Sequence, residues 1–311
     1  MKSIRKLSLA IILVTGLIPV LHAQSLTLER EQLIALTPEW TGERFPDGRP
    51  RVPDQMLERV KALTLEQAWA GLRRAGYENQ YAGDWTIIHP EKPIVGRALT
   101  AQFMPERKTV QKIILEKGKK DGRIGNMVSW PIDELSPGDV YVADSYGKMN
   151  EGPIIGDNLG TSIYANSKNG VVFNGTLRDL EGLESIEGFN AFVKGWHPSH
   201  QMNMMITGIN IPIRIDEATV MPGDVVLAKR EGVMFIPPHL VQQIVISGEF
   251  TALCDQFGHT RLREGKYTPG QIDGKWTDPI KSDFISWLDD HPDVIPMPRE
   301  ELDTYLENRD W

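Results

Sequence analysis

The sequence predicts an α/β domain in which helices cover a mixed or parallel sheet. "GVVFNGTLRD" at 170–179 contains a short β-branched and aromatic run between two glycines, which is typical of a buried strand. "SPGDVYVAD" at 136–144 recurs as "MPGDVVLAK" at 221–229, so a Pro-Gly-Asp turn twice precedes an apolar strand. The 311 residues, 41% hydrophobic and 24% charged, suffice for one large domain or two smaller ones.

Composition argues against several functional classes. The formal net charge of −8 lacks the basic footprint of a nucleic-acid-binding protein, so no nucleic-acid partner is expected. A single cysteine, Cys254, excludes an intrachain disulfide and a CxxC redox pair. The chain also contains no GxSxG, P-loop or GxGxxG phrase, so esterase, nucleotide-hydrolysing and dinucleotide-binding functions have no motif support.

Residues 1–23 are expected to form a signal peptide. Lys2, Arg5 and Lys6 precede an apolar run at 7–21, and the small residue Ala23 follows it. This run is short for a membrane span of about 20 residues. We therefore expect a periplasmic or secreted protein with no stable membrane span after cleavage, with an uncleaved anchor as the alternative.

Residues 24–59 form the next segment, an N-terminal arm that is rich in charge and proline. We expect it to be exposed, to have little regular structure and to wrap a neighbouring subunit. Two helices are predicted within 53–77, because Thr64 and Gln67 form a capping-box pattern in the middle of this stretch and Gly76 can close the second helix. The second helix carries an apolar face that is expected in the core, made of Leu65, Ala68, Trp69 and Leu72.

The strand predictions continue with "IVGRALTAQFMP" at 94–105, where apolar and polar residues alternate. The two Pro-Gly-Asp phrases indicate a pseudo-symmetric β-rich core, and chance repetition of a common turn phrase is the alternative.

A glycine-led loop lies between the two phrases. Gly156 precedes a predicted helix that runs to about 168, and its first residues are Asp157, Asn158 and Leu159. The unpaired backbone N–H groups of such a helix start suit a carboxylate or phosphate. Arg178 and Asp179 are then expected in the loop at the carboxyl end of the strand, where open α/β sheets usually bind ligands; a surface ion pair is the alternative.

The run "GDNLGTSIYANSKNGVVFNGTLRD", with "SPGDVYVAD" before it and "FVKG" and "MPGDVVLAKREGVMFIP" after it, resembles one known family. This family contains the regulator of ribonuclease activity A and the 4-hydroxy-4-methyl-2-oxoglutarate aldolases. The resemblance covers roughly 60–240 and implies a catalytic domain with a swivelling β/β/α fold. It also implies a homotrimer or homohexamer with active sites between subunits, and divalent-metal chemistry, with magnesium or manganese, that cleaves or decarboxylates 2-oxo acids.

Carried onto this chain, the resemblance gives roles to particular residues. Asp179 would be the direct protein ligand of the metal, with water at its other positions. The metal would act as a Lewis acid on the 2-oxo oxygen and stabilise an enolate. Lys194, in "FVKG", would keep a positive charge near the site, with a solvated lysine as the alternative. The residues that would bind the substrate are Gly156, Asp157, Asn158, Leu159 and Arg178.

Three positions concern proton transfer. Gln67 stands where the aldolases carry an acid that reaches across the subunit interface, and a neutral amide is no general base. Gly182 stands where the aldolases have a second acid, whereas Glu231 matches an acidic position of the family and is a candidate catalytic residue. The comparison therefore indicates retained metal and enolate chemistry with altered proton transfer.

The segment "GWHPSHQMNMM" offers a weaker metal hypothesis. His197 and His200 are three residues apart, but Pro198 intervenes and no third ligand is evident, so a substrate-facing role is preferred. The methionines Met202, Met204 and Met205 are expected in the core.

Residues 241–311 form a C-terminal extension outside the resemblance. It contains two short helix candidates, "IKSDFISWLDD" and "PREELDTYLENR". Trp276, Trp287 and Trp311 are expected to anchor it to the body or to a neighbour.

Three functions remain open at this point. The first is an exported divalent-metal-dependent carbon–carbon lyase of the aldolase or decarboxylase type that takes a small 2-oxo acid or related oxo compound. The second is a lyase or hydratase for an oxidised sugar, and the third is a non-catalytic binding protein of the same family.

Overall fold

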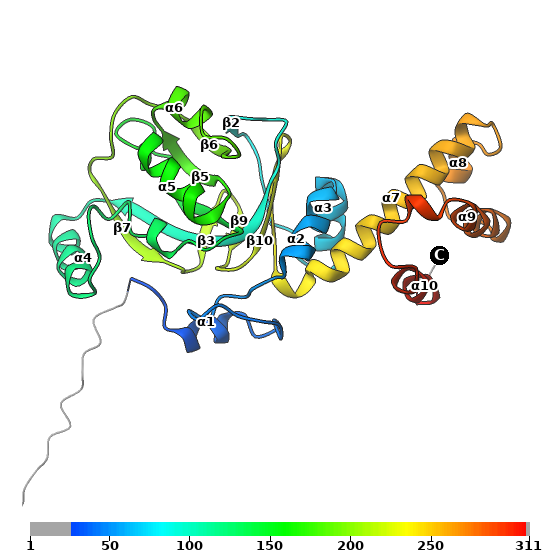
Figure 1. Ribbon diagram of the computed structural model, residues 1–311, viewed down its shortest axis with the longest axis horizontal. Helices are drawn as coiled ribbons and strands as arrows, with labels where there is room; N and C mark the ends of the chain where they lie inside the picture. Colours follow the sequence, from blue (N-terminus) through cyan, green and yellow to red (C-terminus); the bar gives the residue numbers. More distant parts are fainter. Residues whose placement is uncertain (1–25, 309–311) are drawn as a thin grey trace, which may run out of the picture.

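The computed structural model describes residues 26–308, so the predicted signal peptide and Trp311 lie outside the described part. One nine-stranded sheet dominates it, in the order β1-β11-β10-β3-β4-β5-β6-β2, with β7 paired to β3 (Figure 1). The small strands β8 and β9 pair with each other. The strand bounds are β1 (Tyr81–Ala82), β2 (Thr86–Ile87), β3 (Ile94–Pro105), β4 (Asp139–Asp144), β5 (Val171–Leu177), β6 (Ala191–Trp196), β7 (Met204–Ile209), β8 (Ile213–Ile215), β9 (Ala218–Val220), β10 (Val225–Lys229) and β11 (Gly232–Ile236).

Helices precede, interrupt and follow the strands. The helix bounds are α1 (Arg30–Leu36), α2 (Asp54–Ala62), α3 (Leu65–Arg74), α4 (Lys108–Lys120), α5 (Asp157–Ser167), α6 (Leu180–Glu184), α7 (Val241–Arg263), α8 (Pro269–Ile272), α9 (Asp278–Asp290) and α10 (Arg299–Glu307). None of the helices between residues 26 and 308 combines the length and the apolar content that crossing a bilayer requires.

The centre of the sheet is mixed, as the sequence predicts. Strands β3, β4, β5 and β6 pair in parallel, whereas β10 pairs antiparallel with β3 and with β11. Six of the seven β5 residues are buried, because helices and loops cover both faces of this parallel part. The strand runs through Gly175 to Leu177, four residues further than its apolar run at 171–173.

The two Pro-Gly-Asp phrases form equivalent turns on either side of β3. Arg97 of β3 lies in register with Asp139 at the start of β4 and with Val225 at the start of β10. The Asp139 carboxylate accepts a hydrogen bond from the Ser136 N–H (2.9 Å), and the Asp224 carboxylate accepts one from the N–H of Met221 (2.8 Å). The repeat therefore builds one turn twice, although β4 is parallel to β3 and β10 is antiparallel.

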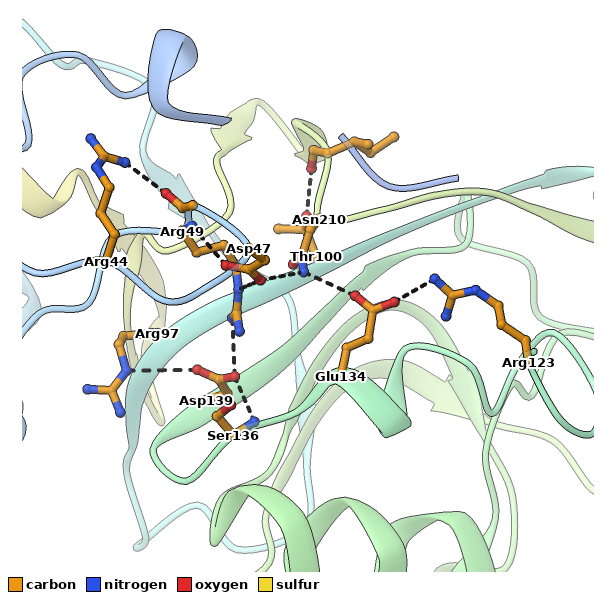
Figure 2. A network of polar contacts seen from close by, with 12 residues as sticks. Arg44, Asp47, Arg49, Arg97, Thr100, Arg123, Glu134, Ser136, Asp139 and Asn210 are labelled. Carbon is orange, nitrogen blue, oxygen red and sulfur yellow. Dashed lines mark hydrogen bonds and ion pairs between the residues drawn. The ribbon is translucent and has the colours of Figure 1, made fainter. Parts of the chain in front are cut away.

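The N-terminal arm is docked on its own domain through several buried residues, although many of its other residues are exposed, as the sequence predicts. Contact with a neighbouring subunit stays a prediction. Arg49 is 1% exposed and donates hydrogen bonds to Asp47 (2.7 Å) and Asp139 (3.1 Å). Figure 2 shows this network crossing from the arm to the sheet and continuing through Asn210 to Glu134. A buried guanidinium needs carboxylate partners, and Asp139 supplies one at the start of β4.

Helices α2 and α3 confirm the predicted pair. The Thr64 hydroxyl accepts a hydrogen bond from the Gln67 N–H (3.2 Å), and the Gln67 side chain accepts one from the N–H of Thr64 (3.0 Å), which is the predicted capping box. Trp69 is an exception to the predicted core face, because its side chain is 46% exposed and lies beside the Arg73 guanidinium.

The C-terminal extension begins with a continuous 23-residue helix, α7, that the sequence did not reveal. Its first half packs on α3, and α8 and α9 gather around its far half, away from the sheet (Figure 1). Helix α10 lies nearer the middle of α7, where Tyr305 packs on Phe250. Trp276 and Trp287 pack against Phe257 and Phe284 inside this lobe. They therefore form the core of the extension and do not anchor it to the sheet domain.

A salt bridge joins the extension to the N-terminal helices. Arg59 on α2 pairs with Glu249 on α7 (2.6 Å) and with Glu301 on α10 (2.9 Å). Glu249 is 4% exposed, so this contact is largely removed from water.

Candidate functional site

The start of α5 and the end of β5 meet at one edge of the sheet. The Arg178 N–H donates to the Ile155 carbonyl (3.3 Å), and a Cβ at Gly156 would collide with the Asp179 carboxylate. The β4–α5–β5 crossover explains this, because α5 runs back against two parallel strands. The helix therefore starts at the edge where β5 ends, so only glycine leaves room for the aspartate.

A cavity of about 200 Å³ opens between these two segments. Arg178 and the α5 start from Gly156 to Leu159 line one side of it, and His200 lines it from the loop after β6. Apolar side chains, including Val128 and Ile154, supply the remaining wall. The arrangement combines one cation, backbone N–H groups and an imidazole around an apolar floor, which suits a small carboxylate-containing ligand.

Arg178 and Asp179 form a loose ion pair. The distance from Arg178 Nε to Asp179 Oδ2 is 3.5 Å, and the side chains are 42% and 36% exposed. A pair this exposed stabilises a fold very little. Both groups remain accessible to a ligand. The small contribution to stability therefore does not explain why the two residues stand side by side.

Asp179 has a left-handed backbone conformation, with φ 59° and ψ 46°. This conformation is uncommon outside glycine, although aspartate tolerates it better than most residues. The Leu183 N–H donates to the Asp179 carbonyl (3.0 Å) and helps to hold the turn. The turn directs the carboxylate back toward Gly156. Unusual backbone of this kind gathers at functional sites.

The N–H groups at the α5 start are not equivalent. The Asn158 N–H donates to Asp157 Oδ1 (2.7 Å), so its own neighbour occupies it. Within residues 26–308 no hydrogen bond is assigned to the N–H of Asp157 or of Leu159. These two groups, at the positive end of an eleven-residue helix, are the ones free to hold an anion.

Lys194 does not line this cavity. Its ammonium donates to the Gly83 carbonyl and to Asp216 Oδ2, both at 2.9 Å, and lies 4.1 Å from the centre of the Trp85 ring. Asp216 balances its charge, so the cation expected near the site is used within its own chain in a different place.

Glu231 and Gln67 also lie apart from the cavity within one chain. Glu231 occupies the turn between β10 and β11, two and three strands beyond β4, and pairs with Arg230 (3.1 Å). Gln67 belongs to the α3 capping box. Gly182 does lie close to the cavity, where a Cβ would crowd the Asp157 side chain, so this turn has no room for the family's second acid.

His200 lines the cavity, which agrees with the substrate-facing role that the sequence favours for its segment. That prediction rests on the position of the segment directly after "FVKG". His197 points elsewhere, because its Nδ1 lies 2.8 Å from the Ser199 hydroxyl. Of the neighbouring methionines, Met204 and Met205 are buried as expected, whereas Met202 is 42% exposed.

Chelation by several side chains is not found at this edge. Between residues 26 and 308 no group of three or more His, Cys, Asp or Glu side chains is placed to hold a metal ion. Asp179 supplies one accessible carboxylate, which lies against Gly156. Such a donor set fits a magnesium or manganese ion that keeps most of its water, since Mg²⁺ is commonly bound through one or two carboxylates.

Comparison with known proteins gives the same assignment for the central part of the chain. A family model described as "RraA-like: Aldolase/RraA" matches residues 62–235. Protein DlpA of Legionella pneumophila is 28% identical over 153 residues, which are 49% of this chain and 23% of that protein. A Halalkalibacterium halodurans protein with the provisional name 4-hydroxy-4-methyl-2-oxoglutarate aldolase is 31% identical over 104 residues, 33% of this chain and 49% of that protein. The chain thus spans about a quarter to a half of the length of these two relatives.

Solved structures share the fold. An uncharacterized protein of Pseudomonas syringae pv. tomato superposes with a TM-score of 0.58 at 19% identity, covering 72% of this chain and 100% of that one. A Streptomyces coelicolor protein, titled an unusual member of the RNase ES inhibitor RraA protein family, gives 0.55 at 22% identity, covering 68% and 98%. At these identities the likeness concerns the fold alone.

Proposed function

Because the chain belongs to the RraA-like family, which includes aldolases, we propose that it is a divalent-metal-dependent carbon–carbon lyase of the aldolase or decarboxylase type. Its substrate in this proposal is a small 2-oxo acid or a related oxo compound. The observation that carries the proposal is a cavity lined by Arg178 and the α5 start, with the Asp179 carboxylate against Gly156 of its wall.

Substrate binding follows from the groups around this cavity. The Arg178 guanidinium offers two parallel N–H donors to a carboxylate, a geometry that a lysine ammonium does not reproduce. Asp157 and Leu159, whose N–H groups are free, line the same cavity and add the positive end of the α5 dipole. Together they would fix a carboxylate-bearing substrate with its oxo group toward Asp179.

Asp179 would hold the metal, and the lack of a side chain at Gly156 leaves room for its carboxylate. When bound, a divalent ion supplies Lewis-acid polarisation of an oxo group, which lowers the cost of breaking the adjacent carbon–carbon bond. Arg178 lies next to the same position and would stabilise negative charge that develops on the substrate oxygens.

Proton transfer is assigned to His200 in this proposal. It is the imidazole among the cavity-lining residues, and Gln67, Lys194 and Glu231 lie elsewhere within the chain. A histidine positioned at a reacting group typically contributes a 10²- to 10⁴-fold rate effect. His200→Gln should therefore lower kcat and flatten its pH profile while leaving the fold intact.

The test is an assay of the purified protein with magnesium or manganese against a panel of 2-oxo acids and oxidised sugars. Metal-dependent release of pyruvate or carbon dioxide from a 2-oxo acid is the expected result. Turnover confined to the oxidised sugars would favour the sugar lyase or hydratase. Binding without turnover of any compound would favour the non-catalytic alternative.

Two further parts of the proposal concern the whole protein. Export through the basic and apolar segment at 1–23 places the enzyme in the periplasm or outside the cell. Assembly as a homotrimer or homohexamer would bring a neighbouring subunit's residues, with Glu231 and Lys194 as candidates, to each cavity. Light scattering tests the assembly, and N-terminal sequencing of the protein from the cell envelope tests the cleavage.

A further inference from the structure

The second Pro-Gly-Asp turn contains a buried carboxylate that lacks the cations of the first. Asp139 lies 3.1 Å from the Arg49 guanidinium and 3.8 Å from that of Arg97. Asp224 is 1% exposed, and its Oδ2 accepts a hydrogen bond from the N–H of Met221. No ion pair within residues 26–308 reaches Asp224. A buried carboxylate without a cation is costly, so the difference between the two turns calls for an explanation.

Asp224 lines a cavity of about 120 Å³. The arm supplies one wall, with Glu39 and Trp40, while Tyr77 and His239 supply the other. This cavity shares no lining residue with the one at the end of β5. Its arm wall lies before the family match at 62–235, so the cavity depends on a segment that the matched part of the family does not include.

The walls of this cavity include acidic and aromatic side chains. Glu39 and Asp224 are close enough to Tyr77 that, after burial itself, their negative charges raise the pKa of its hydroxyl. Tyr77 Oη lies 3.5 Å from His239 Nε2, so these two rings form one side of the space. Among the described residues, 26–308, no lysine or arginine lines the cavity. Carboxylates combined with the faces of tryptophan and tyrosine are the usual recognition elements for organic cations.

We propose that this cavity binds a small organic cation, a primary alkylammonium whose charged end pairs with Asp224 and whose alkyl part packs on Trp40 and Tyr77. The volume accommodates about four water-sized groups, which matches a three-carbon chain and its ammonium. The ligand takes the place at Asp224 that Arg49 takes at Asp139.

Burial also raises the pKa of Asp224 to about 7. A cation beside the carboxylate favours its charged form, so binding near neutral pH releases a proton. The affinity should therefore rise between pH 6 and pH 8 as Asp224 ionises.

Equilibrium dialysis with radiolabelled n-propylammonium at pH 8 and low salt tests the proposal. Saturable binding of one cation per chain is expected, with no competition from 1-propanol, its uncharged analogue. Asp224→Asn keeps the acceptor for the Met221 N–H but removes the charge, and should weaken binding at least 10-fold. Asp290→Asn removes an equal charge from α9, in the C-terminal extension, and should leave binding unchanged.

A second variant keeps the test decisive if Asp224→Asn fails to fold. Trp40→Leu removes the aromatic face without touching the buried turn, and should weaken binding several-fold. Absence of saturable binding to the parent protein overturns the proposal, as does equal binding by Asp224→Asn. Equal displacement by 1-propanol would show that the site does not select for charge, which also overturns it.

Discussion

Two arginine–aspartate pairs at the ends of sheet strands have the same chemistry and opposite environments. Arg49 and Asp139 meet at 3.1 Å with side chains 2% and 0% exposed, whereas Arg178 and Asp179 lie 3.5 Å apart and are 42% and 36% exposed. The first pair joins segments 90 residues apart, and the second joins consecutive residues. The buried pair is therefore organised by the fold, and the exposed pair is left available to a ligand.

The comparison separates stability from function. Removing one partner of a buried pair leaves an uncompensated charge and strongly destabilises a protein, whereas breaking an exposed pair costs little. Catalytic groups, in contrast, must be exposed in the free protein, because a substrate has to replace the water around them. Mutations in the two pairs should consequently affect different measurements.

The largest effect is expected for Arg49→Met. It leaves Asp139 buried with only the more distant Arg97, and should lower the free energy of unfolding by about 3–5 kcal/mol. Denaturant unfolding measures this change. Arg51→Met is the matched control, because Arg51 belongs to the same arm and pairs with Glu43 at the surface, where about 0–1 kcal/mol is expected. Equal effects of the two substitutions would contradict the assignment.

Asp224 extends the comparison to a buried aspartate with no arginine. Its carboxyl would ionise near pH 4 in the unfolded chain but keeps its proton to about pH 7 when folded. The folded state therefore binds more protons in this window, and the stability that the neutral carboxyl contributes is lost as the pH rises from about 4 to 7.

The contribution of Asp224 is about 2–4 kcal/mol, and Asp224→Asn should remove this part of the pH dependence. Unfolding measured at pH 4.5 and pH 8 for both proteins provides the check. If the parent and the variant change in parallel between these two values, Asp224 ionises normally in the folded protein.

Asp179→Asn should have the next largest effect, on activity alone. Loss of the anionic ligand should reduce metal-dependent turnover at least 100-fold, about 2.7 kcal/mol, and weaken metal binding. The melting temperature should hardly change, since the carboxylate is partly exposed. Calorimetric titration with Mn²⁺ and steady-state kinetics measure both properties, and full activity with unchanged affinity would remove Asp179 from the site.

The smallest effect is expected for Arg178→Lys. The charge remains, but the planar two-donor geometry is lost, so kcat/KM should fall at least ~10-fold, or about 1.4 kcal/mol. Stability should stay within about 0.5 kcal/mol of the parent. A lysine variant that turns over the best substrate as well as the parent does would show that Arg178 is an ordinary surface residue.

Features encoded by neighbouring residues could be predicted from the sequence. The apolar run at 171–173 with its glycines marks β5, and the capping box at Thr64 marks the start of α3. Arg178 and Asp179 follow from the same logic, because the residues after a parallel strand lie at its carboxyl edge. Their proximity to Gly156 required the crossover topology, which the local pattern does not contain.

Features made by distant contacts could not be predicted. Arg49 appears in a polar, proline-rich stretch, and only Asp139, 90 residues later, turns it into a buried residue. The apolar residues of α7 show no single helical repeat. The helix packs on α3 at one end and on α8 and α9 at the other, so different faces are apolar along its length. Lys194 matched a family position in sequence, yet Asp216 and Gly83 determine where its ammonium lies.

The contact of Arg59 with Glu249 and Glu301 has a consequence for the timing of folding. Its partners lie 190 and 242 residues later in the chain, so α2 cannot complete its native contacts until α7 and α10 have been made. Contacts of such long sequence separation slow folding, because a large loop must close before they form. The nascent chain should therefore remain incompletely folded until α10 leaves the ribosome, a state in which chaperones can still act on it.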